Sequence, residues 1–130
     1  MIGKARLALI ILARYVRVRF DLRRYPLPEL VGRYSALPPR RRRYPVRTLG
    51  RGVERLLLLP GRPLRCLPRA LVLYSLVVEQ SHDARLMVGL PDTSATYQAH
   101  AWVEIGGVDI GPSPGRDGHQ ALASYPLEAT

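Results

Sequence analysis

Apolar residues recur at helical spacing in three parts of the chain. Residues 1–24 predict an amphipathic helix that ends at Pro26 and Pro28. Residues 46–59 predict a second helix. The third helix begins at Cys66, and its apolar residues follow the i, i+3, i+4, i+7 pattern of a buried helix: Leu67, Ala70, Leu71, Tyr74, Val77 and Val78.

The first helix has two distinct sides at 100° per residue. Its large apolar residues lie along one side: Leu7, Ile11, Tyr15, Val18 and Leu22. Arginines lie along another: Arg6, Arg14, Arg17 and Arg24. The apolar run at residues 7–13 is too short for a signal peptide or a membrane span, and no cleavage pattern follows it.

The pattern changes to strands after the third helix. Residues 85–90 predict a short strand and residues 99–105 a strong one, with a turn at residues 91–94 between them. Gly106-Gly107 suits a tight hairpin, with residues 108–111 as its return strand. The last twenty residues, rich in Gly, Pro and Ser, predict no element. Together the elements predict a small α+β protein.

Charge divides the chain in two. The 130 residues carry a net charge of +10, with 18 Lys or Arg against three acids up to Arg69 and two against seven after it. A basic excess is typical of nucleic-acid binding, although its uneven distribution complicates that interpretation. A GC-rich genome also raises arginine content, but it does not explain why the arginines nearly stop at residue 69. The segment SALPPRRRRYP at residues 35–45 predicts an extended linker. We therefore expect a basic helical region at residues 1–48 and a second unit at residues 49–130.

Length and cysteine content exclude several classes of protein. The length of 130 residues fits one small domain and excludes a multidomain machine. One cysteine excludes an intramolecular disulfide and an all-cysteine zinc site, so a disulfide-rich secreted protein is excluded. The reducing cytoplasm is the expected compartment.

Cys66 and His100 are the candidate catalytic residues. The free N–H groups and the positive end of the helix dipole at Cys66 favour a thiolate, although a buried, inert cysteine fits the same position. His100 lies in a strand between apolar residues and shares a face with Trp102 and Glu104, where it is either a functional or a structural histidine. The other two histidines, His82 and His119, are expected in solvated loops, and Trp102 in the core.

A resemblance to a known family rests on three strings. RCLPRAL at residues 65–71, LMVGL at residues 86–90 and AHAWVE followed by GG resemble the leader peptidases of lasso-peptide biosynthesis, which belong to the transglutaminase-like superfamily. The resemblance runs from about Leu49 to Gly111. It implies a transglutaminase-like or papain-like core in which the Cys66 helix packs on a small antiparallel sheet.

The resemblance also implies a function. Such enzymes are cysteine proteases that remove the leader from a ribosomally made precursor peptide, and their chemistry needs no metal or organic cofactor. They act with a separate leader-recognition protein and pass the core peptide to an ATP-dependent macrolactam synthetase. The arginines at residues 40–43 form either a solvated linker or a docking patch, for that partner or for an acidic leader segment.

The third catalytic residue is the weakest match. The resemblance implies a Cys-His-Asp triad, and the strand after His100 offers Asp109. A tight hairpin pairs Asp109 with Glu104 and leaves His100 opposite Ser113, which puts Asp109 about 13 Å along the sheet from His100. Either the return strand is bulged or the turn differs, or another group, such as Ser113 or a backbone carbonyl, holds the imidazole. Asp109 is the best candidate among the carboxylates.

Three alternative functions stay open. The same Cys66 and His100 pair would also support acyl transfer. The N-terminal arginines would suit a nucleic-acid-binding module, although no nucleic acid is expected for a leader peptidase. The helix at residues 1–24 would suit a membrane surface, so membrane association is left open.

Gly89 is expected where two backbones pack closely.

Overall fold

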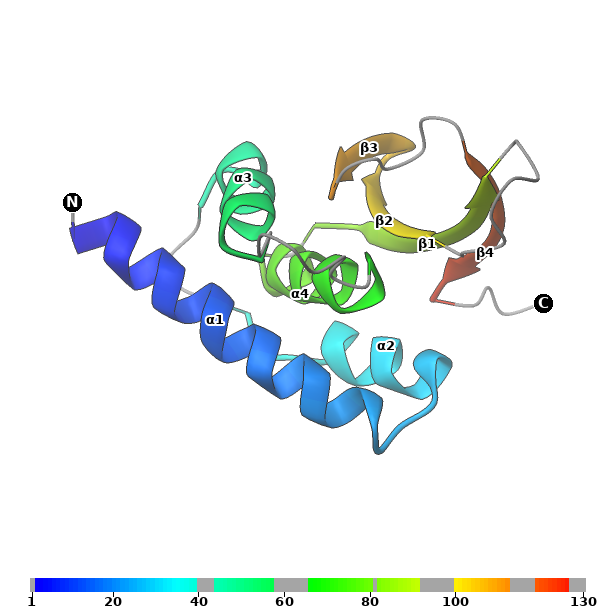
Figure 1. Ribbon diagram of the computed structural model, residues 1–130, viewed down its shortest axis with the longest axis horizontal. Coiled ribbons are helices and arrows are strands. Elements are labelled where there is room, and N and C mark those ends of the chain that lie inside the picture. Colours follow the sequence, from blue (N-terminus) through cyan, green and yellow to red (C-terminus); the bar gives the residue numbers. More distant parts are fainter. Residues whose placement is uncertain are drawn as a thin grey trace.

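The computed structural model describes residues 2–39, 44–57, 66–80, 82–91, 100–112 and 119–126. The helices in these ranges are α1 (Ile2–Leu22), α2 (Leu27–Ser35), α3 (Val46–Leu57) and α4 (Cys66–Glu79). The strands are β1 (Ala84–Pro91), β2 (His100–Ile105), β3 (Val108–Gly111) and β4 (His119–Tyr125). The predicted α+β class is therefore confirmed (Figure 1).

Helix α4 is the centre of the molecule. Every residue from Pro68 to Val77 is buried, because α1, α2 and α3 pack on one side of α4 while β1 and β2 pack on the other (Figure 1). Pro68 suits the first turn, where a helix needs no backbone N–H donor. The prediction of a buried helix that begins at Cys66 is confirmed.

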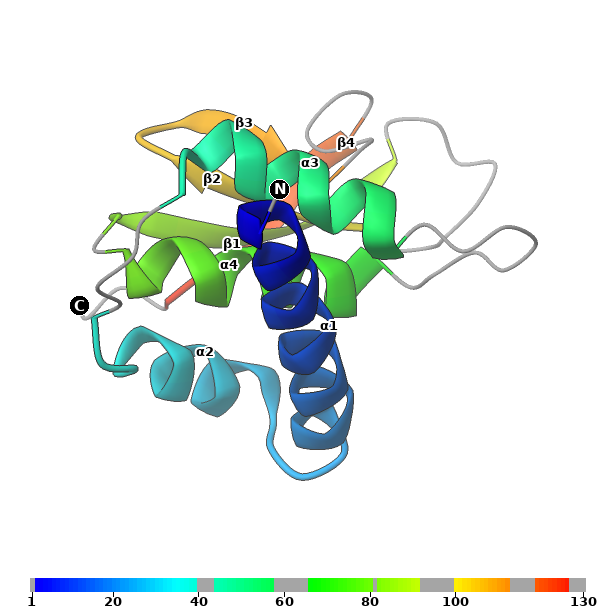
Figure 2. The ribbon, with the colours of Figure 1, turned by 90° about the vertical axis from the view of Figure 1, so that its left-hand side faces the viewer.

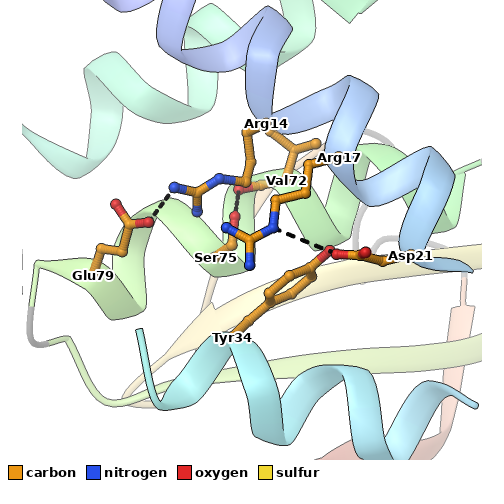
Figure 3. Close-up of polar contacts among 7 residues, drawn as sticks. All are labelled: Arg14, Arg17, Asp21, Tyr34, Val72, Ser75 and Glu79. Carbon is orange, nitrogen blue, oxygen red and sulfur yellow. Dashed lines mark hydrogen bonds and ion pairs between the residues drawn. The ribbon is translucent and has the colours of Figure 1, made fainter. Parts of the chain in front are cut away.

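Helix α1 packs on α4 with the predicted apolar side but not with that side alone. Leu7, Ile11 and Val18 are buried as expected. Arg14, expected among the arginines of the polar side, is also buried, and its guanidinium forms an ion pair with the Glu79 carboxylate of α4 (Figure 3). The partner lies 65 residues away in the sequence, so helical periodicity could not reveal it.

Two elements were not predicted. Helix α1 ends at Leu22, before the prolines that were expected to end it. Pro26 at the N-cap and Pro28 in the first turn instead begin helix α2. Strand β4 occupies part of the last twenty residues, where no element was expected. His119, expected in a loop, is instead the first residue of β4.

The sheet is antiparallel, with the order β3-β2-β1-β4. The predicted hairpin between β2 and β3 is confirmed, since Gly106 and Gly107 adopt φ angles of 58° and 82° that suit a two-residue turn. Ala101 and Val103 belong to the core that α4 shares, so Trp102 and Glu104 lie on the opposite face of β2.

Gly89 of β1 confirms the expected close approach of two backbones. A Cβ at Gly89 would lie 2.5 Å from the backbone oxygen of Gln120 in β4 and 2.8 Å from the Trp102 ring. No side chain fits in that space, so only glycine lets β4 and the indole close over β1.

The hydrophobic core crosses the boundary expected at residue 48. It joins buried residues of α1 and α2 to those of α3, α4 and the sheet. The division into residues 1–48 and 49–130 stays a prediction, and the arginines at residues 40–43 lie outside the described residues. Among the helices described, none is long and apolar enough to cross a membrane.

Candidate active site

The two candidate catalytic residues open their elements at the same end of the molecule. His100, the first residue of β2, pairs with Gly89 near the end of β1. Cys66 is the first residue of α4, and α4 begins at the end of the sheet where β1 ends and β2 starts (Figure 2). The fold therefore brings together two backbone positions that are 34 residues apart in the sequence.

The start of α4 has the electrostatics expected for a nucleophilic cysteine. The first turn carries no acidic residue. Its backbone N–H groups have no partner within the helix, so they and the helix dipole favour negative charge at this end. Arg69 adds a permanent positive charge one turn further on, where it is 7% exposed. The side chain of Cys66 lies outside the described part of the structure.

Arg69 is a residue of the candidate site that the sequence analysis missed. Its i+3 spacing from Cys66 could have indicated it, because long helical side chains lean over the preceding turn. The string RCLPRAL contains this pair, but the burial of Arg69 depends on the elements around α4, which the string does not specify.

His100 is half-buried on the face of the sheet that α4 does not cover. It shares this face with Trp102, which is fully buried and donates its indole N–H to the Glu104 carboxylate at 2.8 Å. The expectation that Trp102 lies in the core is confirmed. His100 therefore lies on the opposite face of the sheet from α4, at the end of the sheet where α4 and β2 both begin.

The structure does not bring Asp109 to His100. The hairpin pairs Asp109 with Glu104, as the sequence predicts, which is about 13 Å along the strands from His100. A register shift does occur between Val103 and Glu104, but it lies beyond the pair of Glu104 and Asp109 and leaves that pair in place. The Asp109 carboxylate is exposed and accepts a hydrogen bond from the Gly111 backbone N–H at 2.8 Å. Ser113 lies outside the described residues.

The other two histidines occupy opposite ends of the molecule. His119 pairs with Pro91 across β1 from His100, so its backbone lies at the candidate site. His82 follows the other end of α4, and its backbone N–H donates to the Val77 carbonyl at 3.2 Å. Within the described ranges, no group of three or more His, Cys, Asp or Glu residues is placed to hold a metal ion.

Comparison with known proteins identifies the family. No curated protein and no solved structure matches the chain. Residues 10–124 match a family model described as the transglutaminase-like superfamily. The match begins within α1 and extends into β4, so it includes both Cys66 and His100. The chain therefore belongs to the transglutaminase-like superfamily.

Proposed function

We propose that this protein is a cysteine peptidase that removes the leader from a ribosomally synthesised lasso precursor peptide. The observation that carries the proposal is the opening of α4 by Cys66 at the end of the sheet where β2 opens with His100, in a chain of the transglutaminase-like superfamily. The resemblance of residues 65–71 and of the His100 strand to leader peptidases supplies the substrate class.

The chemistry follows from a thiolate and an imidazole at one end of the sheet. The Cys66 thiolate attacks the scissile carbonyl carbon, and a C–S bond forms. The resulting oxyanion lies near the backbone N–H groups of the first turn of α4. The C–N bond then breaks as the His100 imidazolium donates its proton to the leaving amine.

Hydrolysis of the thioester completes the cycle. His100, now neutral, takes a proton from water, and the water oxygen attacks the thioester carbonyl. The C–S bond breaks, which releases the carboxylic acid product and restores the thiolate. Asp109 stays a prediction as the third member of the triad, and its pairing with Glu104 argues against that role.

The proposal places the protein in a short reaction sequence. A separate leader-recognition protein delivers the precursor in the cytoplasm, and an ATP-dependent macrolactam synthetase consumes the core peptide. The basic surfaces of the described helices, including Arg47, Arg51 and Arg55 exposed on α3, suit an acidic segment of a leader or partner.

The test is cleavage of a leader-bearing precursor, followed by mass spectrometry in the presence of the recognition protein. We expect wild type to release leader and core, and both Cys66→Ala and His100→Ala to abolish release. The matched control is His82→Ala, because His82 is also half-buried but follows the opposite end of α4. Cleavage that persists in both site variants would overturn the mechanism.

The same experiment separates the alternative functions. With a primary amine added, an acyltransferase would give an amide product in place of the acid, and this product would also disappear in Cys66→Ala. A nucleic-acid-binding module would instead show salt-dependent binding to DNA or RNA that survives Cys66→Ala, with no cleavage in any variant.

A further inference from the structure

Helix α1 carries a second apolar stripe that the core does not use. The stripe consists of Leu9, Leu12, Val16 and Phe20, which are all exposed. Their spacing of three, four and four residues aligns them along one side of the helix. We call this side the outer face of α1, since Ile11 and Val18 on the opposite side pack into the core.

Arginines flank the outer face on both sides. At 100° per residue, Arg6 and Arg17 lie on one flank of the stripe and Arg19 on the other. From Ala5 to Phe20, the exposed side chains are of only two kinds, apolar and arginine: Ala5, Arg6, Leu9, Leu12, Ala13, Val16, Arg17, Arg19 and Phe20. The outer face therefore presents apolar surface and positive charge, with no acid, amide or hydroxyl among these exposed side chains.

The outer face points away from the candidate active site. Figure 2 shows α1 in front of α4, with the sheet behind α4. The exposure of Leu9, Val16 and Phe20 shows that the other described elements do not cover this face. Its apolar side chains are therefore open to a large, flat partner without movement of the fold.

We propose that the outer face of α1 binds the surface of an anionic lipid membrane, with α1 lying in the plane of the membrane. Apolar side chains with arginines on both flanks suit the boundary of acyl chains and negative headgroups, where long arginine side chains reach the phosphates. This function goes beyond peptide cleavage and does not depend on it.

Two other occupants fit the outer face less well. A second copy of the chain would bring the arginine flanks of two α1 helices together, and like charges repel. A specific protein partner normally forms directional hydrogen bonds at about one per 100–200 Å² of interface, and the stripe offers no side chain for them. Binding to a fluid anionic membrane does not require hydrogen bonds at fixed positions.

The test is co-sedimentation of the full chain with vesicles. We expect binding to vesicles of phosphatidylcholine mixed with phosphatidylglycerol, weaker binding at high salt, and little binding to phosphatidylcholine alone. Arg6→Gln should weaken partitioning about fivefold, since each cation near an anionic surface contributes about 1 kcal/mol.

A matched pair of variants isolates the outer face. Val16→Glu should abolish vesicle binding, whereas Val108→Glu should leave it unchanged, because the two valines are 67% and 64% exposed and Val108 lies on the sheet. Both variants should keep wild-type circular dichroism and wild-type precursor cleavage, so a failure here is distinct from a failure of the proposed peptidase.

Three results would overturn the membrane proposal. One is an equal loss of vesicle binding in both variants, and another is the absence of binding to anionic vesicles by wild type. The third is a dimer of the lipid-free protein in sedimentation velocity that Val16→Glu dissociates, since the outer face would then be covered by a second copy.

Discussion

At Gly89, the lack of a Cβ lets three strands pack together. The space above its Cα holds the Gln120 carbonyl of β4 and the Trp102 ring of β2. We expect Gly89→Ala to lower the free energy of unfolding by about 1–3 kcal/mol, because the added methyl overpacks this contact. Urea denaturation measures the change.

Gly32 of α2 provides the control for Gly89. A Cβ at Gly32 meets no atom within 4 Å, and the residue lies inside an exposed helical turn. Gly32→Ala should therefore raise the free energy of unfolding by about 0.5–1 kcal/mol, since alanine loses less backbone entropy on folding. Equal effects at the two glycines would contradict the close approach at Gly89.

Tyr34 couples stability to alkaline pH. Burial raises the pKa of its phenol, and the hydrogen bond to Asp21 at 3.0 Å raises the pKa further (Figure 3). The phenol thus stays neutral in the folded chain, while in the unfolded chain it ionises near pH 10. The folded state holds more protons above that pH, so stability should fall as pH rises, by about 1.4 kcal/mol per pH unit for one such group.

Tyr34→Phe should make this alkaline loss of stability less steep. Burial also raises the pKa of Tyr74, so part of the slope should remain in the variant. Urea unfolding midpoints measured between neutral pH and about pH 11 test the prediction. A slope identical to wild type would show that Tyr34 ionises equally in both states.

Individual residues of the site were predictable where local rules decide them. The start of α4 at Cys66, the strand at His100 and the pairing of Asp109 with Glu104 all follow from helix periodicity and hairpin geometry. The burial of Arg69 does not, because it depends on how distant elements close around α4.

At the scale of elements, one buried ion pair joins α1 to α4. Arg14 and Glu79 are both largely inaccessible, with side chains 9% and 6% exposed. Glu79→Gln leaves the Arg14 guanidinium buried without its counter-charge, so we expect a loss of about 3–5 kcal/mol in the free energy of unfolding. Replacing both residues, Arg14→Met with Glu79→Leu, should recover most of that loss.

Glu29→Gln is the matched control for this ion pair. Glu29 pairs with Arg33 at 3.4 Å on the surface of α2, where both side chains are about half exposed. Solvent screens such a pair, so its loss should cost less than about 1 kcal/mol. Thermal and urea unfolding of both single variants distinguish the two cases, and similar losses would contradict the structural role of Glu79.

Tertiary contacts, not local pattern, define the two elements that the sequence did not predict. Helix α2 has nine residues next to prolines, and it is held by the burial of Leu30, Val31 and Tyr34. Strand β4 has a mixed sequence, HQALASY, and gains its backbone hydrogen bonds from β1. Helices α1, α3 and α4 were predictable because each is a long segment with helical periodicity, which local sequence shows without knowledge of tertiary contacts.

At the scale of the whole molecule, one hydrophobic core includes residues on both sides of the expected boundary at residue 48. Without residues 1–48, the side of α4 that α1 and α2 cover would be exposed to water. We therefore expect a chain of residues 49–130 to unfold without a cooperative transition, while the full chain unfolds cooperatively. Near-UV circular dichroism during heating tests this, and a cooperative transition in the fragment would support two independent units.

The position of β1 in the sheet determines the order in which the molecule can be assembled. β1 lies between β2 and β4, and its partner β4 is the last strand of the described chain. During synthesis the four helices leave the ribosome first, and one edge of β1 stays unpaired until residues 119–125 have emerged. The described sheet that carries His100 is therefore complete only after β4 has emerged, although β1 and β2 are made long before it.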